Sequence, residues 1–168
     1  MAENKTSFME EFQPFWKNLW PVFAVIAMAG ILYHATVLTM ANTWLANETY
    51  SHGFIILPIT LWLLWQHRFE IAVARAKTDY RIYPLLLLSL LVWMLSESLG
   101  IQALAQLALV SSVIFAIWTL TGTGMGKVIF FPVVFLLFMV PVGDFLIPPM
   151  MEFTATFTVN LLRMTGIP

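Results

Sequence analysis

The sequence has no cysteine and few charged residues. Without cysteine, these residues form no disulfide, no thiolate metal site and no cysteine nucleophile. Asp, Glu, Lys and Arg make up only 10% of the chain, whereas about 25% is usual in soluble domains. The net charge of -1 leaves no basic face for binding phosphates. We therefore expect no nucleic-acid partner and no thiol chemistry from these residues.

Apolar residues dominate instead. Of the 168 residues, 60% are hydrophobic, and the mean hydropathy is +0.85. This composition predicts an all-α fold, a polytopic membrane helix bundle. The first apolar run, Leu19–Met40, has about 22 residues and spans roughly 33 Å as a helix, which is too long for a signal-peptide core. We expect a retained anchor after a short cytoplasmic tail, residues 1–18, in which Pro14 interrupts any long helix.

The distribution of basic residues predicts the orientation. Ala41–His52 contains no Lys or Arg, whereas Gln66–Arg81 contains Arg68, Arg75, Lys77 and Arg81. Basic loops remain on the cytoplasmic side of a bacterial inner membrane, so we expect the N-terminus there too. The apolar stretch between these loops is short, and a re-entrant segment would suit its length. Because the loops differ in charge, we expect a crossing that starts near Asn47 and is kinked by Pro58.

Further apolar runs predict three more crossings: Tyr83–Leu99, a run from Ile101 or Ala103 to Leu120, and Val128–Val142. A flexible cytoplasmic turn at Gly122–Lys127 is expected to join the last two. Residues 19–168 would then form one membrane region with about five transmembrane helices.

The final segment, Phe145–Thr165, has a different pattern. Polar side chains recur at helical spacing opposite apolar ones, which is typical of a helix lying in the membrane interface. A sixth crossing is the alternative, because the segment is just long enough. The polar residues are Glu152, Thr156, Asn160 and Arg163.

Few residues suggest chemistry. His52, at the outer mouth of the second span, either exchanges protons near neutral pH or is an interfacial histidine that forms a hydrogen bond to a neighbouring loop. We expect His34 to form a hydrogen bond between helices and His67 to be solvated. Glu97 is either a functional intramembrane carboxylate or a side chain that reaches interfacial water. Asp144 and Glu152 flank a Pro-Pro pair, but no histidine or third carboxylate is near, so we expect no metal and no cofactor.

Three stretches, taken together, resemble the exosortase family. They are Thr49–Phe54 followed by Pro58 and Trp62–Arg68, then Phe131–Pro141, and then Gly143–Pro149 with Leu162–Pro168. The resemblance implies an integral membrane cysteine peptidase or transpeptidase. Such enzymes process the C-terminal sorting signals, called PEP-CTERM, of proteins exported by bacteria that make exopolysaccharide. In the family the nucleophile comes later, in an Ala-Cys-Ser-Gly motif, followed by an arginine and a histidine.

The resemblance therefore implies the N-terminal part of an exosortase, inactive alone, and none of these residues receives a catalytic role. We expect them to form the periplasmic entrance for the sorting signal, with four candidates on one face: His52, Asp144, Glu152 and Arg163. Two alternatives remain, a non-catalytic membrane subunit or scaffold and a small transporter. A transporter would fit the intramembrane Glu97 and His34, although no inverted repeat supports it.

Overall fold

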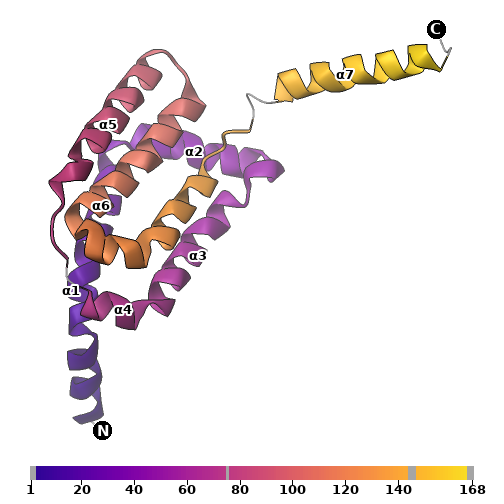
Figure 1. Cartoon of the computed structure of the whole chain (residues 1–168). Coiled ribbons are helices and arrows are strands. Elements are labelled where there is room, and N and C mark those ends of the chain that lie inside the picture. Colours follow the sequence, from indigo (N-terminus) through magenta and orange to yellow (C-terminus); the bar gives the residue numbers. More distant parts are fainter. Residues whose placement is uncertain (1–2, 75, 144–146, 166–168) are drawn as a thin grey trace.

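The computed structural model describes residues 3–74, 76–143 and 147–165 (Figure 1). The described residues form helices joined by short loops and include no strand, which confirms the all-α prediction. The elements in chain order are α1 (Glu3–Leu32), α2 (His34–Ala46), η1 (Glu48–Tyr50), α3 (Gly53–Gln66), α4 (Arg68–Val73), η2 (Tyr80–Ile82), α5 (Tyr83–Ser98), α6 (Gln102–Phe135), η3 (Leu136–Met139) and α7 (Ile147–Met164).

The predicted first span, Leu19–Met40, is bent rather than straight. Two helices, Asn18–Leu32 and His34–Ala46, meet at 91°, and Tyr33 between them leaves the helical conformation with φ -110° and ψ 30°. The Tyr33 ring packs edge-on against Trp93 of α5, with ring centroids 4.4 Å apart. Since the bend depends on a contact with a distant helix, the local apolar pattern could not reveal it.

The proline in the N-terminal tail does not interrupt the helix. Helix α1 continues from Glu3 through Pro14 to Leu32, so the predicted break is wrong. A proline removes only one helical hydrogen bond and can be accommodated as a local distortion. At the junction with the apolar part of α1, Asn18 donates its amide hydrogens to the carbonyl oxygens of Ile71 (2.8 Å) and Ala74 (3.1 Å). These bonds join α1 to the end of α4.

Helix α3 begins later than predicted. It starts at Gly53 and not near Asn47, because the Asn47 side chain accepts a hydrogen bond from the Thr49 backbone amide and caps η1. Pro58 lies inside the helix as expected. The 14 residues of α3 extend about 21 Å, less than the roughly 30 Å of a bilayer core. A crossing by α3 alone therefore stays a prediction.

Helices α5 and α6 form a helical hairpin from two of the predicted crossings. Helix α5 covers Tyr83–Ser98, almost the whole predicted run, and α6 returns alongside it (Figure 1). Gly100 in the connection has φ +70°, a conformation that residues with a Cβ rarely adopt. This sharp connection places the two helices side by side without a loop domain.

Helix α6 folds back on itself at Gly122, where φ is 70° and ψ is 179°. The rings of Trp118 and Phe130, on opposite sides of this kink, lie 5.5 Å apart, although a straight helix would separate them by about 18 Å. The predicted turn exists, but it is confined to Gly122, and Gly124–Lys127 are helical. A Cβ at Gly122 would overlap the Lys77 carbonyl, so the kink is fixed by a close backbone contact.

The core lies between α1, α3, α4 and both arms of α6. Its buried side chains include Leu19, Val22, Leu64, Ile71, Val110, Ile114, Ile117, Met125, Ile129 and Val133. Of the described helices, Tyr80–Ser98 and Gln102–Met139 are long and apolar enough to cross a membrane, and the bent pair makes up to three spans. The predicted number of about five crossings is not confirmed by helix length and composition.

Helix α7 forms where a helix was predicted and lies apart from the other helices (Figure 1). All of its described side chains are exposed. Phe153 and Phe157 stack on one face, with ring centroids 6.2 Å apart. The helix is not among those long and apolar enough to cross a membrane. The choice between an interfacial position and a sixth crossing stays a prediction.

Candidate functional site

Among the predicted site residues, His52 has the most extensively packed surroundings. They lie at the junction of α2, η1, α3 and η3. We call this junction the rim. Trp44 of α2 is buried and donates its indole N–H to the carbonyl oxygen of Met139, 2.9 Å away. Tyr50 of η1 is also buried and packs with Met40 and Trp44. Aromatic side chains thus hold together segments that are nearly a hundred positions apart in the sequence.

Two glycines allow this packing. At Gly53, a Cβ would overlap the Trp44 indole ring. At Gly143, a Cβ would lie 2.7 Å from the Tyr50 hydroxyl oxygen, which is closer than ordinary contacts permit. The glycines that follow His52 and precede Asp144 therefore have a structural role. They let two chain segments approach the aromatic side chains.

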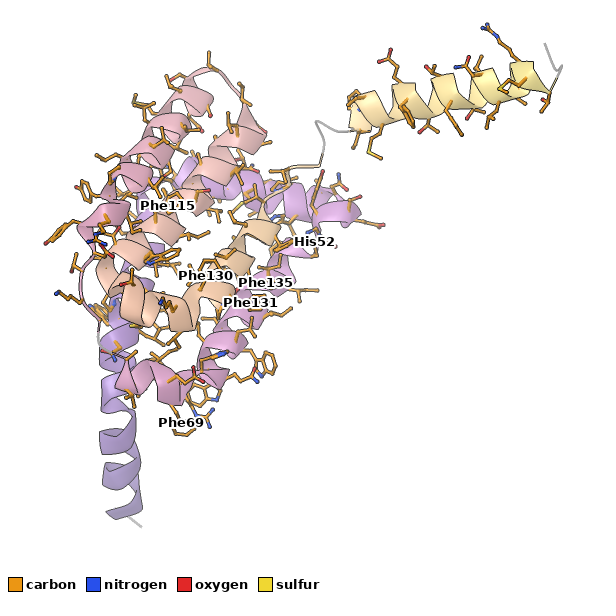
Figure 2. All side chains as sticks on the ribbon, in the orientation of Figure 1. His52, Phe69, Phe115, Phe130, Phe131 and Phe135 are labelled. Atoms are coloured by element: carbon orange, nitrogen blue, oxygen red, sulfur yellow. The ribbon has the colours of Figure 1, made fainter. Side chains whose placement is uncertain are left out.

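His52 is the exposed member of this arrangement. Its Nδ1 lies 2.9 Å from the Thr49 carbonyl oxygen, a geometry in which Nδ1–H donates. In the neutral ring that tautomer leaves Nε2 with a lone pair, and Nε2 has no hydrogen-bond partner among the described residues. Figure 2 shows His52 at one end of the α3–α4 segment and Phe69 at the other. The rim can therefore offer an oriented hydrogen-bond acceptor to a ligand.

The turn before His52 is held by its own hydrogen bonds. The Ser51 hydroxyl donates to the Glu48 carbonyl oxygen at 2.8 Å, and the Thr49 amide donates to the Asn47 side chain at 3.0 Å. These bonds fix Asn47–His52 between two helices. The imidazole is consequently presented from a defined turn.

The structure does not bring Glu152 or Arg163 to His52. Glu152 and Arg163 lie on α7, whose described side chains are all exposed, away from the packed rim. Asp144 lies outside the described residues. A single entrance formed by all four side chains therefore stays a prediction, and the structure supplies geometry only for His52.

A polar contact at the α1–α2 bend was missed by the sequence reasoning. The Thr36 hydroxyl donates to the Glu97 carboxylate at 3.3 Å and accepts from the Trp93 indole N–H at 3.2 Å. Glu97 itself is exposed. The carboxylate therefore joins α5 to α2, and its contact with interfacial water stays a prediction. The spacing of residues within α2 or within α5 does not predict this contact between the two helices.

The two remaining histidines contact backbone carbonyl oxygens where consecutive helices meet. Nδ1 of His34, at the start of α2, lies 3.3 Å from the carbonyl oxygen of Ile31 in α1, so this contact crosses the break between the two helices. Nδ1 of His67 lies 2.9 Å from the Leu63 carbonyl oxygen, and the side chain is half-buried rather than fully solvated. Both histidines sit where a helix breaks, and the Leu63 carbonyl oxygen also accepts the His67 backbone amide at 3.2 Å. Among the described residues, no three His, Asp or Glu side chains are grouped to hold a metal ion.

Comparison with known families identifies the matched part of the chain. The family model of the transmembrane exosortases matches residues 44–168. The chain belongs to the transmembrane exosortase family. The matched region begins at Trp44, the central aromatic side chain of the rim, and includes His52 and both rim glycines. No curated protein and no solved structure matches the chain.

Proposed function

We propose that this exosortase-family chain forms the membrane part of a peptidase or transpeptidase that receives PEP-CTERM sorting signals at the rim. The family match over residues 44–168 carries the proposal. The rim supports it, because buried aromatic side chains hold an exposed imidazole whose Nε2 has no partner among the described residues. A backbone N–H of an extended signal peptide is a suitable donor to that nitrogen.

These 168 residues supply recognition rather than bond cleavage. They contain no cysteine, and an exosortase acyl-enzyme needs a thiolate. The nucleophile would come from an Ala-Cys-Ser-Gly segment of the enzyme, and the substrates would be exported proteins linked to exopolysaccharide. The rim would face the periplasm and the N-terminus the cytoplasm, because the basic loop is at the other end of α3.

Site-specific photo-crosslinking tests the recognition step without requiring catalysis. A photoreactive phenylalanine analogue at position 52 should crosslink to a tagged protein carrying a PEP-CTERM signal in membranes. The same analogue at Arg81, an exposed residue of the basic loop, is the matched control and should not crosslink. Equal yields at both positions, or none at position 52, would contradict recognition at the rim.

The peptidase assignment is tested at the level of the gene. Sequencing the DNA downstream of the Pro168 codon should reveal a continuation that encodes Ala-Cys-Ser-Gly. A stop codon without such a continuation would favour the non-catalytic subunit and would remove the peptidase activity from this chain.

A further inference from the structure

We infer that the chain holds an anionic phospholipid between α1 and α3, with the phosphate against Arg68 and an acyl chain in the adjoining groove. This site lies at the opposite end of α3 from His52, and Phe69, beside Arg68, marks its position in Figure 2. It is independent of the proposed signal recognition. It requires only that the chain sits in a membrane.

The groove is apolar and open on one side. It has a volume of about 410 Å³, within the roughly 300–1,000 Å³ of typical ligand pockets. Leu19 and Leu64 are buried and form its floor. Its walls carry exposed side chains, since Trp16 is 54% exposed, Leu61 50% and Trp65 44%. The complete lining is Trp16, Leu19, Phe23, Leu61, Leu64 and Trp65.

Arg68 contacts Trp65, one of the lining residues of this groove. Its guanidinium carbon is 5.3 Å from the centre of the Trp65 ring and 4.4 Å from that of Phe69. One terminal nitrogen donates to the Trp65 carbonyl oxygen at 3.2 Å. The aromatic faces and this carbonyl fix the position of the charge beside one wall of the groove.

The charge of Arg68 is not neutralised by the described side chains, because none of them places a carboxylate within ion-pair distance. Its Nε is also buried without a hydrogen-bond acceptor in the described part of the chain. A buried donor without an acceptor is costly, and guanidinium groups bind phosphate in a bidentate geometry. An anion with several oxygen atoms matches this unpaired guanidinium.

A lipid fits both the apolar groove and the Arg68 guanidinium, whereas a free phosphate ion fits only the guanidinium. The groove adjoins Trp65, and Trp65 also contacts Arg68, so an acyl chain in the groove brings its own headgroup to the guanidinium. Tryptophan side chains at a membrane boundary commonly mark the level of the headgroups, and Trp16 and Trp65 line this groove. Basic pockets between membrane helices are known binding places for anionic headgroups.

The test uses the whole chain in nanodiscs that contain equal amounts of phosphatidylcholine and phosphatidylglycerol. Native mass spectrometry measures which lipid stays bound to the chain after the chain is released from the nanodisc. The wild-type chain should retain phosphatidylglycerol preferentially. Arg68→Gln should reduce this preference about fivefold, the equivalent of about 1 kcal/mol for one basic residue near the membrane surface. Arg81→Gln removes the same charge from a residue outside the groove and should leave the preference unchanged.

A second variant tests the groove separately. Leu61→Trp enlarges an exposed side chain in the wall of the groove. The larger ring should fill the groove and displace the lipid while Arg68 is intact. Excess inorganic phosphate should not displace phosphatidylglycerol from the wild-type chain. Equal effects of Arg68→Gln and Arg81→Gln would overturn the inference. So would competition by phosphate together with no effect of Leu61→Trp, because the site would then bind free anions.

Discussion

At the scale of single residues, the glycines show where the fold depends on the absence of a side chain. Gly53 lies under the Trp44 indole ring and Gly143 lies under the Tyr50 hydroxyl, whereas Gly30 in α1 has nothing within 4 Å of an added Cβ. The family motif around His52 therefore combines a packing requirement with an exposed imidazole. Substitutions at these positions can separate the two.

We expect Gly53→Ala to lower the free energy of unfolding by about 1–3 kcal/mol, the usual cost of overpacking a close contact. Gly30→Ala is the matched control, because in a helix interior with open space it should stabilise by roughly 0.5–1 kcal/mol. Denaturation of the purified chain in detergent, followed by circular dichroism, measures both values. A neutral Gly53→Ala would show that the Trp44 ring can move aside.

Gly100 and Gly122 form a second pair, because both have φ +70° but only Gly122 has a neighbour near an added Cβ. Alanine at Gly100 should cost about 1–2 kcal/mol, the penalty for a left-handed backbone. Alanine at Gly122 should cost more, because the overlap with the Lys77 carbonyl is added. The same denaturation experiment compares them, and equal losses would mean that the basic loop does not hold the kink.

At the scale of the elements, side-chain hydrogen bonds add to the apolar packing between helices. Asn18 connects α1 to the last carbonyl groups of α4. Because α4 has only 6 residues, its stability depends on such contacts more than on helix propensity.

Asn18→Ala should therefore destabilise α4 by about 1–3 kcal/mol, because it removes two hydrogen bonds from carbonyl groups at the helix end. Hydrogen exchange of the α4 amides should become faster, with little change in α5. Asn42→Ala is the control, since Asn42 is exposed on α2. Unchanged exchange in α4 would show that apolar packing of Ile71 is sufficient.

The bend between α1 and α2 depends on Thr36, which bonds to both Glu97 and Trp93. Thr36→Val keeps the shape and removes the hydroxyl, so the 91° angle should open or become variable. Because the chain has no cysteine, spin labels on introduced cysteines at Met28 and Leu45, both exposed, report only that distance. A distance distribution identical to that of the unsubstituted chain would assign the bend to the contact between Tyr33 and Trp93 alone.

At the scale of the whole molecule, sequence patterns predict α5 well and the bent segments poorly. The run Tyr83–Leu99 is long and apolar, so its helix needs no distant partner to be recognised. The bend at Tyr33 and the fold at Gly122 depend on Trp93 and Lys77, which belong to other segments. The place of His52 at the mouth of a helix was predicted, but the rim also depends on Met139, which bonds to Trp44, and on Gly143, which lies against Tyr50.

The orientation of the molecule is open to a direct test. If the rim is periplasmic, a cysteine from Ser51→Cys should react with a membrane-impermeant maleimide in intact spheroplasts. A cysteine from Thr78→Cys, an exposed position in the basic loop, should react only after permeabilisation. The reverse pattern would invert the topology that the basic residues predict.

Backbone hydrogen bonds between the basic loop and α6 also set an order of assembly. The Lys77 and Asp79 amides donate to the carbonyl oxygens of Thr121 (3.3 Å) and Thr119 (2.9 Å), so the connection closes only after the ribosome has passed Thr121. Until then α5 must reside in the lipid without its main neighbour. Its two buried hydroxyls, on Ser89 and Ser96, bond to backbone oxygens of α5 itself. The helix can therefore enter the bilayer early with these hydroxyls already satisfied.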